Sequence, residues 1–168
     1  MQQNTYVIDG GQAGKERLSL IGRVLRPTTA QLFERLGLRA GMRALDVDCG
    51  GGVVTLELAR LAGAGGFVVG LDADEAILAL AQQDAVSARV RNVAFRRADA
   101  LELDEPATYD LVYARFLLTH LAEPQRALAG MVWAARPGGL VVAEDIDYTG
   151  SICCPPNPAF QRYLSAEG

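Results

Sequence analysis

The fold is decided by the stretch Arg43-Ala-Leu-Asp-Val-Asp-Cys-Gly-Gly-Gly-Val-Val-Thr-Leu-Glu-Leu-Ala-Arg60. Apolar residues surround Asp46, glycines follow, and apolar residues recur at helical spacing from Val54 to Leu61. The pattern predicts a buried strand, a tight turn and a helix. Glycines let a backbone approach a ligand closely, and unpaired amides at a helix start favour a carboxylate or a phosphate. The stretch therefore predicts a nucleotide-binding turn.

Strand and helix patterns continue to alternate as far as residue 146. Asp74 is expected to cap the next helix, Arg115–Leu121 to form a short helix, and Pro124 to start a helix that runs to Arg136 and stops at Pro137-Gly-Gly139. Four further apolar segments predict strands: Phe67–Asp72, Val93–Arg97, Tyr109–Tyr113 and Leu140–Ile146. Such alternation is typical of an α/β fold with a parallel sheet and helices on both faces.

Residues 1–38 predict an extended start and two helices. Helical spacing begins at Ala13 and is interrupted at Pro27, which lacks a backbone donor. Thr28 or Thr29 can cap the second helix, and Gly37 is a typical C-terminal stop. These two helices are expected to precede the first strand and to cover the site.

Length and composition predict a single domain over residues 1–168, with a core at 39–146 and a tail at 147–168. The chain has 168 residues, and half of them are apolar. Its net charge is −4 with dispersed basic residues, so neither a nucleic acid nor a membrane is the expected partner. The three cysteines follow neither a disulfide nor a metal-ligand spacing, and no metal is expected. We expect a cytoplasmic protein that acts on a small molecule.

Two classes of nucleotide-binding fold use a glycine turn of this kind. The dinucleotide fingerprint, Gly-x-Gly-x-x-Gly, fails here because its third glycine position falls on Thr55 when the motif starts at Gly50. The chain also lacks a Tyr-x-x-x-Lys pair. A nicotinamide-dependent dehydrogenase is therefore the less favoured interpretation.

The segment Asp46-Val-Asp-Cys-Gly-Gly-Gly52 resembles the first motif of the class I S-adenosylmethionine-dependent methyltransferases, an acidic residue followed by Gly-x-Gly-x-Gly. Asp72, Asp99 and Arg136–Gly139 agree with the family in order and spacing, over about residues 40–146. The resemblance implies a doubly wound, Rossmann-like and mainly parallel sheet with strand order 3-2-1-4-5, without the family's final strands. It also implies S-adenosylmethionine as the cofactor and N-terminal lid helices above it.

Acidic residues carry most of the expected cofactor contacts. Asp72 lies twenty residues beyond Gly52, a spacing at which a carboxylate can accept both ribose hydroxyls. The resemblance places Asp99 at the adenine amine and Asp46 at the methionine end. A carboxylate inside an apolar strand needs partners, and the amides of the glycine turn are expected to supply them. The full set of expected contacts is Tyr6, Asp46, Asp48, Cys49, Gly50, Gly52, Asp72, Ala73, Asp99, Ala100 and Arg115.

Asp48 is a departure from the family's motif, because it stands where the family has its first glycine. An aspartate adds bulk and negative charge beside the methionine end of the cofactor. The charge effects partly cancel, since the cofactor carries both signs, and steric effects are expected to decide. We therefore expect Asp48 to weaken binding relative to glycine.

Catalysis by methyl transfer needs mainly alignment of the reacting atoms and exclusion of water. A base is needed only for a hydroxyl or a protonated amine. The candidates are His120, for which a structural role is the favoured interpretation, Glu144 with its acidic neighbours Asp145 and Asp147, and Arg115, which can hold an anionic acceptor or pair with an acid. The sequence does not identify the acceptor or its attacking atom.

A second hypothesis belongs to a different functional class. It is a shortened, non-catalytic chain of the same fold that acts through a partner, and Asp48 and the missing final strands favour it. Without those strands, the segment Leu140–Ile146 would leave an apolar sheet edge, which tends to recruit other chains. A homodimer through the fifth-strand edge is therefore expected.

Overall fold

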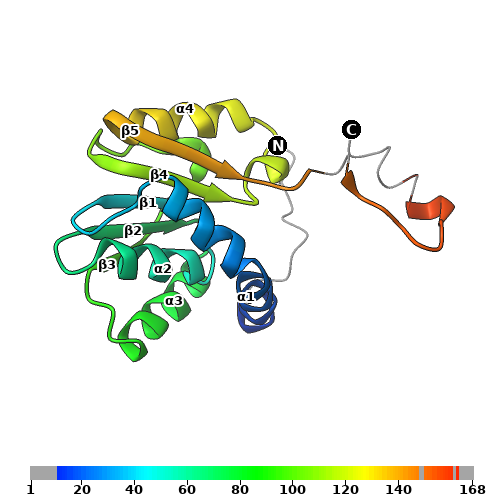
Figure 1. Ribbon diagram of the computed structural model, residues 1–168, viewed down its shortest axis with the longest axis horizontal. Coiled ribbons are helices and arrows are strands. Elements are labelled where there is room, and N and C mark those ends of the chain that lie inside the picture. The colour runs from blue at the N-terminus through cyan, green and yellow to red at the C-terminus, as the bar shows by residue number, and fades with distance from the viewer. Residues whose placement is uncertain (1–10, 148–149, 161, 163–168) are drawn as a thin grey trace.

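The computed structural model describes residues 11–147, 150–160 and 162, and its centre is a five-stranded sheet (Figure 1). The strand order is β3-β2-β1-β4-β5, and each neighbouring pair is parallel. The strands are β1 (Arg43–Val47), β2 (Phe67–Asp72), β3 (Val93–Arg97), β4 (Tyr109–Arg115) and β5 (Ala135–Glu144). The predicted fold class and strand order are confirmed.

Helices cover both faces of this sheet (Figure 1). They are α1 (Gly11–Arg35), α2 (Val53–Ala62), α3 (Glu75–Ser87) and α4 (Pro124–Ala134), with two short 3₁₀ helices, η1 (Ala100–Glu102) and η2 (Leu118–His120). Buried residues of α1 and α2 pack on one face, and those of α4 pack on the other. Asp74 caps α3 as predicted, accepting from the amide of Ala76 at 2.8 Å.

Alternation along the strands divides the core into two layers. Ala44, Val68 and Leu111 face α1 and α2, whereas Leu45 and Val112 face α4. Each of these side chains is at most 2% exposed, and full burial of a valine or leucine contributes about 1.5–3 kcal/mol. Because Asp46 follows Leu45, this alternation directs its carboxylate toward α2.

The N-terminal segment differs from the prediction, because α1 is one helix that contains Pro27. A proline inside a helix costs roughly 3 kcal/mol, since it removes one hydrogen bond and crowds the preceding turn. Packing on both sides of Pro27 offsets this cost. Gly22 lies so close to Val53 that an added Cβ would come within 2.8 Å of its side chain, and Phe33 is fully buried, with its ring 5.2 Å from that of Tyr113. The helix ends before Gly37, as predicted, where φ is 71°.

The connection from α4 to β5 also differs from the prediction. The helix ends at Ala134 instead of Arg136, and β5 starts at once. Tyr109 pairs with Ala135 while Leu111 pairs with Leu140, so the residues between them on β5 form a bulge. The positive φ of Gly138 is compatible with such a bulge. The Pro-Gly-Gly segment is therefore a bulge inside β5 and not a turn before the strand. The strand ends at Glu144, two residues earlier than expected.

The segment predicted as a short helix at 115–121 forms only η2. Arg115 still belongs to β4, and the amide of Phe116 donates to the carbonyl of Glu144 at 2.8 Å. This bond extends the β4–β5 pairing beyond the predicted end of β4. Arg115 and Phe116 therefore form hydrogen bonds within the sheet, although the local helical spacing predicted them to lie in a helix.

The described tail residues 150–160 and 162 lie away from the sheet (Figure 1). A single helical turn begins at residue 158, and Ile152 is 91% exposed. The described part of the tail leaves the outer edge of β5 uncovered, and among described residues β5 pairs only with β4. Within the same residues, no helix combines the length and apolar character needed to cross a bilayer.

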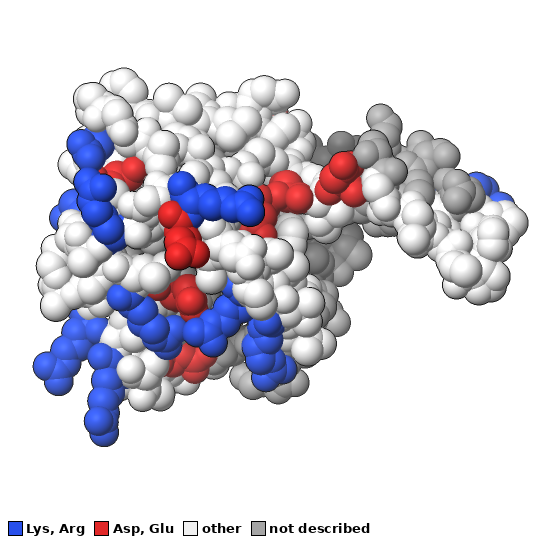
Figure 2. Space-filling model, viewed as in Figure 1, with Lys and Arg blue, Asp and Glu red and all other residues white. Residues whose placement is uncertain are grey.

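Charged side chains of opposite sign lie interspersed on the face shown in Figure 2. Arg26 pairs with Glu57 at 3.2 Å, and Arg136 pairs with Asp110 at 2.7 Å. Exposed pairs of this kind contribute little to stability, typically under about 1 kcal/mol. The expectation that the chain binds neither nucleic acid nor membrane stays a prediction.

Candidate functional site

The carboxyl ends of the parallel strands lie at one edge of the sheet and carry several ionisable side chains. Asp46 is in β1, Asp72 ends β2, Arg115 ends β4 and Glu144 ends β5. Asp48 follows β1 in the glycine turn. Open α/β sheets bind their ligands at this edge, so the fold places these predicted residues where a ligand is expected.

Asp72 holds the glycine turn against the end of β2. One of its oxygens accepts from the amide of Gly50 at 2.8 Å, and the other accepts from the amide of Asp74 at 2.9 Å. Burial raises its pKa, although hydrogen bonds from backbone amides oppose the rise. Each carboxylate oxygen can accept a second hydrogen bond, so Asp72 retains capacity for ligand hydroxyls.

Asp46 has a different partner from the one predicted. The carboxylate is 2% exposed and accepts a 2.6 Å hydrogen bond from the hydroxyl of Thr55 in α2. The expectation that glycine-turn amides pair with Asp46 was wrong, because the amide of Gly50 donates its hydrogen bond to Asp72 instead. The pKa of Asp46 is raised to about 7, because burial outweighs the Thr55 hydrogen bond and the positive charge of Arg115, which both lower it.

Thr55 is a site residue that the sequence reasoning missed. In the sequence, its position only excluded the dinucleotide fingerprint. Thr55 is fully buried on the face of α2 that packs on the sheet, nine residues after Asp46. A polar side chain on an apolar helix face, opposite an acid in an apolar strand, was the available signal.

Asp48 has a backbone conformation that is rare for a residue with a side chain. Its φ is 61°, in the left-handed region that glycine adopts most readily. No hydrogen-bond donor contacts its carboxylate among the residues that the structure describes. Burial and the negative charges of Asp72, Asp46 and Asp99 together raise its pKa to about 7.

The rest of the glycine turn is fixed by packing. Gly52 has φ of 74° and precedes α2, and an added Cβ would lie 2.8 Å from the Phe95 ring. Only glycine suits both the conformation and the space. The amide of Cys49 donates to the carbonyl of Leu71 at 2.8 Å, and burial raises the pKa of the Cys49 thiol well above its usual range.

The remaining predicted cofactor contacts lie next to this turn or outside the described residues. Asp99 is exposed and accepts from the amide of Leu101 at 2.8 Å, so it caps η1, which Ala100 begins. Ala73 is exposed directly after β2. Tyr6 lies outside the residues that the structure describes. Their roles as cofactor contacts stay predictions.

Glu144 belongs to a separate network, which we call the Glu144 cluster: Glu144, Tyr113, Thr29 and Arg115. The hydroxyl of Tyr113 donates to Glu144 at 2.5 Å, and that of Thr29 lies 3.3 Å from the same oxygen. Arg115 donates to the Thr29 hydroxyl at 3.4 Å. Burial and the neighbouring Glu144 raise the pKa of Tyr113. The cluster fastens α1 to the ends of β4 and β5, and sequence reasoning missed both Thr29 and Tyr113 as its members.

His120 is exposed in η2. Its neighbour Thr119 donates its hydroxyl to Asp145 at 2.9 Å, which ties η2 to the chain after β5. Within the described ranges, no group of three or more His, Cys, Asp or Glu side chains is arranged to hold a metal ion.

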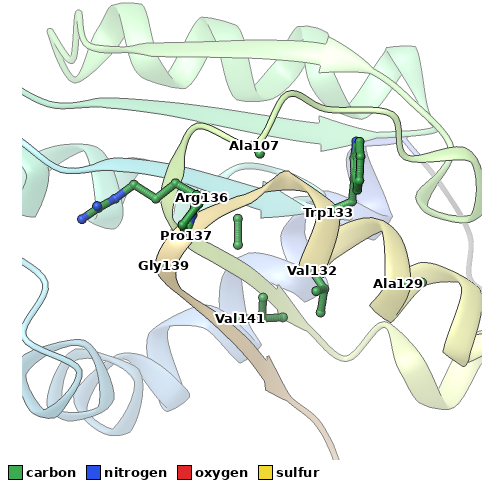
Figure 3. Close-up of a pocket in the computed structure, with 9 residues that line it drawn as sticks. Ala107, Ala129, Val132, Trp133, Arg136, Pro137, Gly139 and Val141 are labelled. Carbon is green, nitrogen blue, oxygen red and sulfur yellow. The ribbon is translucent and has the colours of Figure 1, made fainter.

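A hollow of about 460 Å³ lies away from these residues, between α4 and the start of β5 (Figure 3). Its walls are mainly apolar and include Val132, Trp133 and Val141. Because the hollow adjoins the bulged start of β5 and the acids lie at strand ends, it is not part of the candidate cofactor site.

The doubly wound sheet and the glycine turn between β1 and α2 define a Rossmann-like nucleotide-binding domain, with carboxylates at the adjoining strand ends. A family model described as a methyltransferase domain matches residues 38–159. The chain belongs to this family of methyltransferase domains, whose cofactor is S-adenosylmethionine.

Curated relatives support the assignment. The chain is 33% identical over 119 residues to a ubiquinone biosynthesis O-methyltransferase of Methylococcus capsulatus. The aligned region covers 70% of this chain and 48% of that protein. The chain is 34% identical over 111 residues to a demethylmenaquinone methyltransferase of Shouchella clausii, covering 66% and 47%. The chain thus spans about half the length of these relatives.

Solved structures show the same fold. A SAM dependent methyltransferase from Aquifex aeolicus superposes with a TM-score of 0.68 at 22% identity, covering 83% of this chain and 78% of that one. The [4+2]-cyclase SpnF superposes with a TM-score of 0.63 at 29% identity, covering 70% and 43%. Because SpnF is named as a cyclase, proteins that share this fold are named for more than one kind of reaction.

Proposed function

We propose that this chain transfers a methyl group from S-adenosylmethionine to a small-molecule acceptor in the cytoplasm. The observation that carries the proposal is the pairing of Asp72 with the amide of Gly50, in a chain of the methyltransferase-domain family. This pairing holds a carboxylate with spare acceptor capacity beside a side-chain-free turn. A ribose with two hydroxyls suits such a site.

Each part of the site has a proposed task. Asp72 would bind the ribose, Asp99 and the backbone at Ala100 would bind the adenine, and Asp46 would face the methionine end. The bound cofactor would supply a methyl group on a positively charged sulfur, which needs no metal for activation. The remaining proposed contacts are Tyr6, which lies outside the described residues, Asp48, Cys49, Gly50 and Gly52 in the turn, Ala73 after β2 and Arg115 at the end of β4.

The acceptor would meet the cofactor beside the ends of β4 and β5. Glu144 is already bonded to Tyr113 and Thr29, which makes it a weaker candidate for a base than its position suggests. Arg115 can hold an anionic acceptor, and the exposed His120 can take a proton when the acceptor is a hydroxyl. The names of two relatives make quinone precursors the first acceptors to test.

Titration calorimetry tests the cofactor assignment directly. The purified chain is titrated with S-adenosylmethionine and, separately, with NADH. We expect S-adenosylmethionine to bind and NADH to give no heat of binding. Binding of NADH alone would favour the dehydrogenase interpretation and would contradict the proposal.

The alternative is a non-catalytic member of the family that acts through a partner. Asp48 in the glycine turn favours it, and the name of SpnF shows that methyl transfer does not follow from the fold. Methyl transfer from labelled S-adenosylmethionine to a panel of phenolic and quinone-precursor acceptors distinguishes the two. Cofactor binding without transfer to any acceptor would favour the alternative.

We also propose a homodimer through the outer edge of β5. This edge is unpaired among described residues, and exposed apolar side chains adjoin it, including Trp133 at 67% and Leu140 at 41%. A second β5 could extend the sheet and cover the hollow in Figure 3. Light scattering should give the mass of a dimer, and Leu140→Lys should shift it to a monomer. Val86→Lys, at an exposed position on α3 away from this edge, serves as the control. A wild-type monomer at all concentrations would contradict the proposal.

A further inference from the structure

We infer that Asp48 makes the cofactor site selective for positive charge, so that the sulfonium of S-adenosylmethionine is preferred over the uncharged thioether of S-adenosylhomocysteine. The inference rests on the proposed function. It assigns a role to a residue that departs from the family's motif, and it concerns the difference between substrate and product instead of overall affinity.

The position of Asp48 is fixed by the backbone. It lies between β1 and α2, with φ of 61° in the turn that Asp72 holds through Gly50. Its carboxylate is partly buried and has no hydrogen-bond donor among the described residues. A buried carboxylate without a donor is costly, and the cost falls when a positive charge comes near.

Charges that face Asp48 come from each neighbouring strand. Asp46 lies on β1, Asp72 ends β2 and Asp99 follows β3, and all three repel it. On β4, Arg115 acts on Asp46, and its guanidinium also donates to Thr29 in α1. Among the described residues, four interacting carboxylates therefore lie in or next to the turn, and Arg115 is the cation that acts on one of them. A ligand that brings a positive charge relieves this repulsion, and a neutral ligand does not.

The comparison of the two ligands isolates the sulfonium. S-adenosylmethionine and S-adenosylhomocysteine share the adenine, the ribose, the ammonium and the carboxylate. They differ by one methyl group and one positive charge. Any effect of Asp48 on the shared groups therefore cancels in the ratio of the two dissociation constants, and the effect on the sulfur remains.

Binding of the cation is linked to proton release. Without ligand, the pKa values of Asp46 and Asp48 are both raised to about 7, so each carboxyl is partly protonated at neutral pH. A positive charge favours the ionised form, and the displaced proton passes to the buffer. S-adenosylmethionine should release more protons on binding than S-adenosylhomocysteine does.

The variant Asp48→Asn tests this role. Asparagine keeps the size of the side chain and tolerates positive φ, so the substitution removes the negative charge without changing the backbone or the bulk, although one oxygen becomes an amide NH2. Calorimetry with both ligands, in phosphate and in Tris at pH 7, gives the affinities and the proton release. We expect the ratio of the S-adenosylhomocysteine to the S-adenosylmethionine dissociation constant to fall about threefold to tenfold, with less proton release for S-adenosylmethionine. Asp104→Asn, an exposed position outside the turn, should change neither.

The outcomes of these measurements distinguish failure of this inference from failure of the proposed function. An unchanged ratio in Asp48→Asn would overturn this inference and leave the proposed function intact. Absence of binding by either ligand to the wild type would overturn the proposed function itself. If Asp48→Asn does not fold, the wild-type ratio is measured at pH 6 and pH 8; it should rise with pH as Asp48 ionises, and a constant ratio would overturn the inference.

Discussion

Two groups of acids at the same edge of the sheet differ in what their oxygens contact. In the group around the glycine turn, Asp46 accepts from the hydroxyl of Thr55, Asp72 accepts from backbone amides and Asp48 has no donor among the described residues. In the Glu144 cluster, the carboxylate of Glu144 has two hydroxyl partners and Arg115 is part of the network. The turn has unmet capacity for a ligand, whereas the cluster is largely satisfied within the protein.

One edge of the sheet thus holds two groups of residues with different tasks: the acids around the glycine turn are suited to binding a ligand, and the Glu144 cluster is suited to stabilising the fold. Buried polar groups that already have partners stabilise a fold, and those without partners need a ligand, a proton or water. We therefore expect substitutions in the turn to act mainly on cofactor affinity. Substitutions in the Glu144 cluster should act mainly on the free energy of unfolding.

The largest expected effect belongs to Asp72→Ala. Two charge-assisted hydrogen bonds to the ribose contribute on the order of 1.5–3 kcal/mol each, so affinity for S-adenosylmethionine should fall tenfold or more. The amides of Gly50 and Asp74 also lose their acceptor. Calorimetry measures the loss, with Asp74→Ala as a control that removes only the α3 cap. Equal affinity in Asp72→Ala and wild type would show that the ribose site is assigned wrongly.

Next in size is Glu144→Ala, which leaves the buried hydroxyl of Tyr113 without its acceptor. The free energy of unfolding should fall by about 1–3 kcal/mol, while S-adenosylmethionine affinity changes less than twofold. Urea denaturation measures the first quantity and calorimetry the second. Adding Tyr113→Phe should restore part of the stability, because the unpaired hydroxyl is then removed. A large loss of affinity with little loss of stability would reverse the comparison of the two groups.

A smaller effect is expected for Asp48→Gly, which relieves the positive-φ strain of roughly 1 kcal/mol and removes the bulk. Affinity for S-adenosylmethionine should rise a few-fold to tenfold, and any transfer activity should rise in parallel. The charge that Asp48 loses favours only the sulfonium, so S-adenosylhomocysteine should gain more than S-adenosylmethionine. Tighter binding by the wild type would mean that the attraction of Asp48 outweighs its bulk.

The smallest effect concerns the stability of the ligand-free protein at different pH. Asp46 and Asp48 have folded-state pKa values raised from 3.8 to about 7, so their contribution to stability is greatest at low pH and is lost as pH rises through 7. Between pH 5.5 and pH 8, wild type should lose on the order of 1 kcal/mol more than Asp48→Asn does. Urea denaturation at both pH values measures this. Parallel pH profiles for the two proteins would contradict the raised pKa of Asp48.

Local patterns predicted most of the strands and the position of the glycine turn. The bounds of β2 and β3, the Asp74 cap and the stop at Gly37 all depend on spacing within a few residues, and all are confirmed. Pro27 shows the limit of such rules, because packing of distant residues keeps α1 continuous.

Partners of the buried acids could not be predicted in the same way. Thr29 and Glu144 are 115 residues apart in the chain, and Tyr113 contacts Glu144 from the neighbouring strand. Sequence spacing carries no information on contacts between segments so distant. The pairing of Gly50 with Asp72 was equally hidden, since an amide can reach either of two carboxylates at adjacent strand ends.

The contact between Thr29 and Glu144 also has a consequence for folding during synthesis. At about 5–20 residues per second, the ribosome needs roughly 6–23 seconds to make the 115 residues that separate them. Until β5 emerges, α1 has no Glu144 to hold it at the sheet edge, and the segment carrying Phe33 lacks the ring of Tyr113 for almost as long. Although α1 precedes the other described helices in the chain, the contact between Thr29 and Glu144 is therefore among the last to form during synthesis.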